Sequence, residues 1–120
     1  MEKRIGIIGN GFVGEALAFA FSSKFETRVY DINKSKSLNT LEQVYECEII
    51  FVCVPTPMFS DGTQDLSYIN NVFKNAVHGP LYIIKSTILP GTTLSLIKKN
   101  NLKIIFSPEF LTERTAKLDM

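Results

Sequence analysis

The sequence predicts a doubly wound α/β fold, in which helices cover both faces of a parallel sheet. Three observations support this fold class. Apolar segments of strand length alternate with helical segments along all 120 residues. A glycine-rich turn, Gly9 to Gly14, directly follows the first apolar segment. A carboxylate, Asp31, ends the second strand 20 residues after Gly11. Together they indicate a Rossmann-like sheet in a three-layer α-β-α arrangement.

The first half of the chain gives two strands and two helices. Lys3–Ile8 reads as a buried strand, and the helical spacing of apolar residues predicts a helix over about 12–24. Thr27–Tyr30 is the second strand. Thr40 and Gln43 have the spacing of a capping box, which predicts a brief helix ending near residue 45.

The second half continues the alternation. Glu48–Val54 is almost entirely apolar, as expected for a strand buried on both faces, and prolines stop it at once. A helix over 66–77, with Asp65 as its cap, precedes the strand Leu81–Lys85. A helix over 93–99 then leads to the last strand, Lys103–Phe106.

Length and composition predict one globular domain spanning residues 1–120. The chain is 45% hydrophobic and 21% charged with a net charge of +1, which argues against binding nucleic acid or anionic membranes through bulk charge. No apolar run approaches the roughly 20 residues of a membrane span, so we expect a cytoplasmic protein. Cys47 and Cys53 form no Cys-x-x-Cys pair and are expected to be reduced and buried, and no metal site is expected.

The glycine turn has the form of a dinucleotide-binding turn. Gly9 permits the tight bend, Gly11 lets backbone approach a pyrophosphate, and Gly14 lets the helix pack closely on the strand. The helix directs its N–H groups and positive dipole end toward the phosphates. The alternative is a plain βαβ unit whose glycines serve packing and whose Asp31 caps a turn. The strand–turn–helix context favours dinucleotide binding.

Asp31 also indicates which dinucleotide is bound. Its carboxylate can accept hydrogen bonds from both ribose hydroxyls, and it would repel a 2′-phosphate. Ile32 and Asn33 offer no arginine to receive such a phosphate. The expected cofactor is therefore NAD rather than NADP. Lys36, in the polar segment 33–39, is either a solvated lysine or a ligand to the ribose or an adenosine phosphate.

Polar or glycine clusters follow each predicted strand. They are Gly9–Gly14, Asp31, Pro55-Thr56, Ser86-Thr87 and Ser107–Glu109. In a parallel sheet the carboxyl ends of the strands meet at one edge, where ligands bind. These clusters should therefore converge on one site.

The later clusters carry a more specific resemblance. Val54-Pro55-Thr56-Pro57, then Ile84-Lys85-Ser86-Thr87 with Pro90-Gly91-Thr92, then Ser107-Pro108-Glu109-Phe110-Leu111-Thr112-Glu113, occur in this order. With the glycine turn, this pattern resembles the N-terminal NAD-binding domain of the UDP-glucose/GDP-mannose dehydrogenase family, from Lys3 to about Asp119. Members of this family oxidise a nucleotide sugar, such as UDP-glucose to UDP-glucuronate, with NAD.

The resemblance implies a role for each matching residue. Binding of the cofactor would involve Gly9, Asn10, Gly11, Phe12, Val13, Gly14, Asp31, Lys36, Val54, Pro55, Thr56, Ser86, Thr87 and Glu113. The pyrophosphate would lie against the glycine turn, and the adenosine ribose against Asp31 and Lys36. Thr87 would orient a catalytic water, Glu109 would assist proton transfer, and Phe110 and Leu111 would present backbone to the sugar nucleotide.

For two of these residues the alternative is structural. Glu109 and Glu113 would then stabilise a helix N-terminus through their negative charge. The functional role is favoured for Glu109, because a buried carboxylate beside a hydroxyl can take its proton as hydride leaves carbon. For Glu113 the two interpretations are balanced.

The chain also departs from the family pattern. The segment between the second and third strands, Ile32–Cys47, is shorter than in the family, which leaves Lys36 the least secure transfer. The family's catalytic cysteine, central helix and UDP-binding domain have no counterpart in the 120 residues, so we expect the chain alone to be incomplete as an enzyme. The alternative is a non-enzymatic NAD-binding or regulatory module that associates with a full-length dehydrogenase. In either case UDP-sugar binding would need a second domain, and an apolar patch of Phe110, Leu111 and Leu118 would favour self-association or a partner chain.

Overall fold

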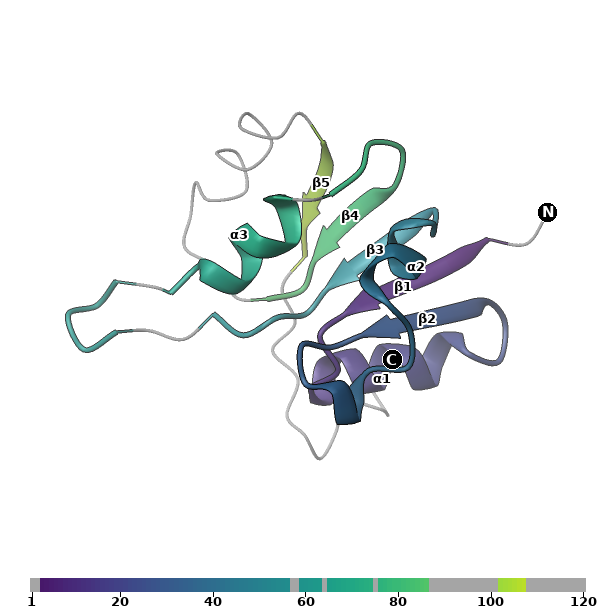
Figure 1. The fold of residues 1–120 in the computed structure, drawn as a ribbon, viewed down its shortest axis with the longest axis horizontal. Helices are drawn as coiled ribbons and strands as arrows, with labels where there is room; N and C mark the ends of the chain where they lie inside the picture. The colour runs from purple at the N-terminus through teal and green to yellow at the C-terminus, as the bar shows by residue number, and fades with distance from the viewer. Residues whose placement is uncertain (1–2, 57–58, 64, 75, 87–101, 108–120) are drawn as a thin grey trace.

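The computed structural model describes residues 3–56, 59–63, 65–74, 76–86 and 102–107. Within these residues, five parallel strands form one sheet in the order β2-β1-β3-β4-β5, as Figure 1 shows. The strands are β1 (Arg4–Ile8), β2 (Glu26–Tyr30), β3 (Ile49–Val52), β4 (Leu81–Ile84) and β5 (Lys103–Phe106). The helices are α1 (Phe12–Phe21), the 3₁₀ turn η1 (Lys34–Lys36), α2 (Leu41–Tyr45) and α3 (Ser67–Lys74). The predicted fold class is confirmed.

The strand order reverses direction at β1. Ile5 is in register with Thr27 of β2 on one side and with Ile49 of β3 on the other. The chain therefore moves outward to β2, then crosses back over β1 before continuing to β3. The carboxyl ends of β1 and β3 form the topological switch point, where open α/β sheets bind ligands.

The two faces of the sheet are covered by different helices. One core cluster contains Ile7 and Phe51 of the sheet with Leu17 of α1. On the other face, Ile50 and Tyr82 pack with residues of α2 and α3. Ile50 and Phe51 are consecutive, so side chains of β3 alternate between the faces and the strand is buried on both. The three-layer arrangement follows from this alternation.

The helix boundaries agree with the sequence only in part. The capping box is confirmed: the Thr40 hydroxyl accepts from the Gln43 N–H, and the Thr40 N–H donates to the Gln43 side chain. α1 ends at Phe21, three residues early, because the Phe25 N–H turns back to the Phe21 carbonyl and β2 begins at Glu26. α3 ends at Lys74, and residues 76–77 are not helical. The predicted helix over 93–99 lies outside the described residues.

A short non-strand segment, Ser37–Asn39, runs along the outer edge of β2. The Leu38 and Asn39 N–H groups donate to the Val29 carbonyl at 3.0 and 2.8 Å. The Asn39 side-chain oxygen accepts from the Val29 N–H at 2.8 Å. The Ser37 hydroxyl oxygen accepts from the Asp31 N–H at 3.1 Å. Side chains and turns thus satisfy the edge groups of Val29 and Asp31 without a further strand.

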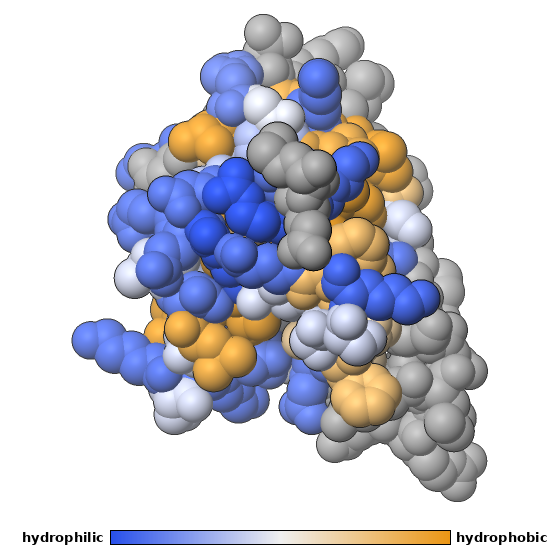
Figure 2. Space-filling model, turned by 90° about the vertical axis from the view of Figure 1, so that its right-hand side faces the viewer, coloured by the Kyte–Doolittle hydropathy of each residue, from blue (hydrophilic) through white to orange (hydrophobic). Residues whose placement is uncertain are grey.

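Polar and apolar side chains both reach the surface, and Phe19, Ile32 and Leu38 are among the exposed large hydrophobic residues. Figure 2 shows one face on which hydrophilic side chains dominate and hydrophobic ones gather in separate patches. Among the helices in the described part of the chain, none has the length and apolar character needed to cross a membrane.

Candidate functional site

The turn between β1 and α1 requires glycine at its first position. Gly9 has a φ of +102°, a left-handed conformation that side chains disfavour. A Cβ atom at this position would lie 2.5 Å from the carbonyl oxygen of Cys53, at the end of β3. The Gly9 N–H donates to the Tyr30 carbonyl at 2.8 Å. Gly9 therefore lets the turn pack between the ends of β2 and β3.

The other two glycines of the motif differ in what surrounds them. A Cβ at Gly14 would overlap the carbonyl oxygen of Gly9, so this position holds α1 close to β1. A Cβ at Gly11 would meet no atom of the described residues within 4 Å. Gly11 is also the N-cap of α1, so no side chain of the cap residue covers the first N–H groups of the helix. The space above Gly11 is thus open beside a helix N-terminus, as phosphate binding requires.

Asp31 lies beside this turn with its carboxylate held by backbone donors. Its Oδ2 atom accepts from the Asn10 N–H at 2.6 Å, and its Oδ1 atom from the Asn33 N–H at 2.8 Å. Each carboxylate oxygen retains a further lone pair, so both can still accept from hydroxyl groups. The sequence prediction that the glycine turn and Asp31 converge is confirmed.

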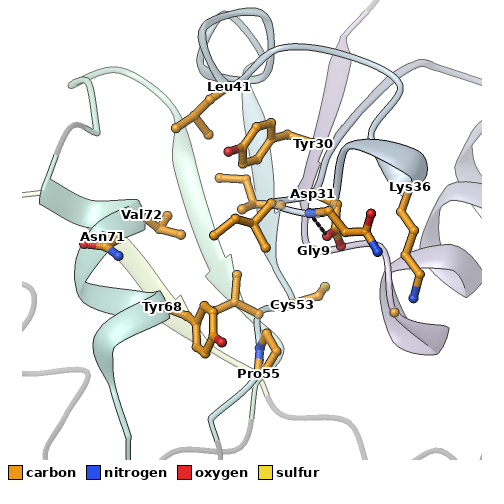
Figure 3. Close-up of a pocket in the computed structure, with 15 residues that line it drawn as sticks. Gly9, Tyr30, Asp31, Lys36, Leu41, Cys53, Pro55, Tyr68, Asn71 and Val72 are labelled. Carbon is orange, nitrogen blue, oxygen red and sulfur yellow. Dashed lines mark hydrogen bonds between the residues drawn. The ribbon is translucent and has the colours of Figure 1, made fainter.

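These residues border a pocket of about 320 Å³, shown in Figure 3. A pocket of this size is at the lower end of small-molecule sites. The predicted residues that line it are Gly9, Gly11, Asp31, Lys36, Val54 and Pro55. Lys36 is exposed and also lines the pocket, and Figure 3 shows it on the same side as Asp31.

The opposite wall was missed by the sequence analysis. Tyr68, Asn71 and Val72 of α3 line the pocket, and Figure 3 shows Tyr68 beside Pro55. Tyr30 and Leu41 lie across from them. The spacing of residues 68, 71 and 72 places them on one helical face, and the sequence analysis named no residue of this helix as part of the site. Tyr68 is only half-buried, which distinguishes it from Ile69 in the core.

A buried hydrogen bond joins the two helices behind the pocket. The Tyr45 hydroxyl of α2 donates to the Val72 carbonyl of α3 at 2.6 Å. Burial raises the pKa of Tyr45 to about 12, with smaller contributions from neighbouring acidic groups. Because the phenol stays protonated, this bond persists over the ordinary pH range and fixes α3 relative to α2.

Other predicted cofactor residues have structural contacts of their own. The Val13 side chain packs against the core cluster on the α1 side. The Ser86 hydroxyl is buried and donates to the Val54 carbonyl at 2.6 Å, which ties the ends of β3 and β4 together. Thr56 is half-buried, just beyond Pro55. Phe12 is the first residue of α1.

The two cysteines have different environments. Neither cysteine forms a disulfide bond. Cys47 is buried, and burial raises its pKa to about 11. Cys53 is half-buried and lines the pocket, so the expectation that both would be buried is wrong for Cys53. Among the residues that the structure describes, no group of three or more His, Cys, Asp or Glu side chains is placed to hold a metal ion.

The remaining predicted residues lie outside the described part of the chain. They are Thr87, Glu109, Phe110, Leu111, Glu113 and Leu118.

The fold, the glycine turn and the carboxylate at the end of β2 define a dinucleotide-binding domain of the dehydrogenase class. A sequence model described as "UDP-glucose/GDP-mannose dehydrogenase family, NAD binding domain" matches residues 37–120, well over half of the chain. The chain belongs to this family, and NAD is the cofactor of this domain. The match begins after the glycine turn, so the turn and the family model are independent indications of the same cofactor.

Individual relatives match over nearly the whole chain. UDP-glucose 6-dehydrogenase of Campylobacter jejuni is 30% identical over 97% of this chain and 39% of its own length. GDP-mannose 6-dehydrogenase of Pseudomonas aeruginosa is 27% identical, with coverages of 97% and 38%. The structure of a UDP-glucose dehydrogenase from Pyrobaculum islandicum has a TM-score of 0.79 at 23% identity, covering 99% of this chain and 38% of that one. The chain thus spans about two fifths of the length of these relatives.

Proposed function

We propose that the pocket holds the adenosine half of NAD and that the glycine turn holds its pyrophosphate. The observation that carries the proposal is the pairing of the open space above Gly11 with the anchored carboxylate of Asp31. Backbone N–H groups at the start of α1 would bind the phosphates. Asp31 would accept hydrogen bonds from the ribose hydroxyls, with Lys36 beside it.

The base would lie between the two apolar walls of the pocket. Tyr68 and Val72 provide one wall, and Tyr30 and Leu41 the other. A flat aromatic base gains stacking and apolar burial in such a slot. The amide of Asn71 supplies both a donor and an acceptor for the edge of the base.

The position of Asp31 also supports NAD over NADP. Its two oxygens are fixed by the N–H groups of Asn10 and Asn33, so the carboxylate cannot turn away from the ribose without losing both bonds. A 2′-phosphate there would face a fixed negative charge at close range. NADP should therefore bind much more weakly than NAD.

For the complete protein we propose the activity that its relatives' names carry, the oxidation of a nucleotide sugar at C6, with UDP-glucose as the preferred candidate. NAD supplies the hydride acceptor. In the motifs of this chain that resemble the family's, Thr87 would orient a water and Glu109 would take the proton of the substrate hydroxyl. Phe110 and Leu111 would present backbone to the sugar nucleotide, and Glu113 would contact the cofactor. This sugar-binding role rests on the sequence motif alone.

We place the protein in a reducing compartment such as the cytoplasm, because neither Cys47 nor Cys53 forms a disulfide bond. Contacts with a second domain or chain would involve Phe110, Leu111 and Leu118, as the sequence suggests.

Calorimetric titration of this chain with NAD⁺ and NADP⁺ tests the cofactor assignment. NAD⁺ should bind and NADP⁺ should bind at least about tenfold more weakly, the factor that 1.4 kcal/mol represents. Gly11→Val should reduce NAD⁺ affinity about 100-fold by filling the phosphate space, while its unfolding free energy falls by only about 1 kcal/mol because valine is a poor N-cap. The NAD⁺ affinity of Gly11→Ala should lie between that of the unmodified chain and that of Gly11→Val.

The matched control is Asn70→Ala, an exposed position of α3 that does not line the pocket. It should bind NAD⁺ as the unmodified chain does. If the unmodified chain shows no heat of binding at millimolar NAD⁺, the proposed function is wrong.

A further inference from the structure

We infer that Asn10 is a positioning residue that sets the distance between the phosphate side and the ribose side of the pocket. The inference rests on the proposed function, because it concerns how the site is held ready for its ligand. Asn10 forms two hydrogen bonds, one to each of two residues that line the pocket. Its backbone N–H donates to Asp31 Oδ2 at 2.6 Å, and its side-chain Nδ2 donates to the Lys36 carbonyl at 2.8 Å. We call this pair of bonds the Asn10 clasp.

The segment on the far side of the clasp is shaped by local bonds. The Asn33 side-chain oxygen accepts from the Ser35 N–H at 3.1 Å, and the Lys36 N–H donates to the Asn33 carbonyl at 2.9 Å. These bonds connect residues within three positions of each other. They define the form of η1 but not its distance from the glycine turn. The bond from Asn10 to Lys36 spans 26 positions, and it joins η1 directly to that turn.

The donors of Asn10 face the protein rather than the pocket. One donates to a carboxylate and the other to a carbonyl, and Asn10 itself does not line the pocket. Its neighbours Gly9 and Gly11 do line it, as does Lys36. Asn10 therefore connects residues that face the ligand without facing it through its own side chain.

This arrangement has a consequence for affinity. The pyrophosphate and the adenosine ribose are adjacent parts of one ligand, so the glycine turn and η1 must be correctly spaced at the same time. A segment ordered before binding does not lose conformational entropy when the ligand arrives. Removing the side-chain bond should leave the glycine turn intact but loosen η1, so that part of the binding free energy is used to order it.

The test compares Asn10→Ala with Asn10→Gln, which retains the amide donor. In Asn10→Ala we expect about a tenfold loss of NAD⁺ affinity by calorimetry, the scale of one lost hydrogen bond. Without ligand, the ¹⁵N heteronuclear NOE of the Lys36 and Ser37 amides should fall, which reports greater motion on the picosecond–nanosecond timescale. Addition of NAD⁺ should restore it. Asn10→Gln should recover part of both the affinity and the NOE, and Asn70→Ala should change neither.

Two outcomes would overturn the inference. If Asn10→Ala binds NAD⁺ like the unmodified chain, the clasp does not prepare the site. If affinity falls while the Lys36 and Ser37 amides stay as ordered as before, Asn10 acts by contacting the ligand directly. The unliganded NOE comparison remains decisive even if the unmodified chain binds no NAD⁺, so a failure of the clasp and a failure of the proposed function give different results.

Discussion

The side of the sheet at which β1 and β3 begin, the amino edge, differs in construction from the side at which they end, the carboxyl edge. At the amino edge, Arg4 Nε and Nη2 donate to Glu48 Oε1 at 3.2 and 3.1 Å, and the Arg4 N–H donates to Glu48 Oε2 at 2.8 Å. The Glu48 N–H and carbonyl continue the ladder to Arg4 and Leu81. At this edge the charged side chains pair with each other and join β1 to the start of β3.

At the carboxyl edge the charged group is anchored but still able to accept more bonds. Backbone N–H groups hold Asp31, and the space beside it is left open above Gly11. The difference shows that this parallel sheet is stabilised by charged groups at one edge and is open to a ligand at the other. Ion pairing at one edge joins neighbouring strands, while the other edge keeps hydrogen-bonding capacity for a ligand. Variants at the two edges should therefore affect different measurements.

The largest expected effect comes from breaking the packed part of the carboxyl edge. Gly9→Ala should lower the free energy of unfolding by about 3 kcal/mol, because the new Cβ meets the Cys53 carbonyl and the backbone has a positive φ. Urea unfolding followed by circular dichroism measures the change. A loss below about 1 kcal/mol would contradict the packing described for this turn. Gly11→Ala, at an open position of the same turn, is the matched control.

A smaller effect is expected behind the pocket. Tyr45→Phe removes the hydroxyl that bonds to the Val72 carbonyl and leaves that carbonyl without this partner, so unfolding should become easier by about 1–2 kcal/mol. Because α3 carries Tyr68 and Asn71, NAD⁺ affinity should also fall, by about twofold to threefold. Chemical denaturation and calorimetry give the two values. An unchanged free energy of unfolding would show that the Tyr45–Val72 hydrogen bond does not contribute to stability.

The smallest effect concerns the amino edge and depends on pH. Hydrogen bonds from the Arg4 backbone and side chain lower the pKa of Glu48 below its ordinary value of 4.5. A lowered carboxyl pKa contributes stability that is present above pH 4.5 and is lost as the pH falls through the folded-state pKa. Glu48→Gln should therefore be slightly less stable than the unmodified chain at pH 7, and the gap should close in acid. Thermal unfolding from pH 7 to pH 3 measures it.

The same variant sharpens the comparison of the two edges. Glu48 is far from the residues that line the pocket, so Glu48→Gln should bind NAD⁺ within about twofold of the unmodified chain. A larger loss of affinity would mean that the amino edge also controls the ligand site.

Features with a local signature were predictable from the sequence. The roles of Gly9 and Gly14 follow from motif spacing, and the Thr40–Gln43 capping box from residues three apart. The convergence of Asp31 with the glycine turn follows from the rule that parallel strands end at one edge. The resemblance to the dehydrogenase family was carried by clusters at these same strand ends, and the family match confirmed it.

The rest depended on tertiary packing. Tyr68 and Asn71 line the pocket because α3 lies beside the residues that follow β1 and β3, a placement that periodicity alone does not give. The bond from Asn10 to the Lys36 carbonyl joins the loops that follow the neighbouring strands β1 and β2, and the exact approach of these loops is not encoded in residue spacing. Lys36 was left with two interpretations for this reason. The exposure of Cys53 depends on where β3 ends, and the apolar run of the sequence continued past that point.

The segment Ser37–Asn39 affects how the molecule behaves in a crowded solution. A border strand with unused donors and acceptors is a template on which another polypeptide can add, the first step of fibril growth. Here the Val29 N–H and carbonyl and the Asp31 N–H are already engaged by neighbouring residues of the same chain. Strand addition from another molecule along the carboxyl half of β2 would first have to displace that segment, so the turn that leads into α2 also covers part of this border strand.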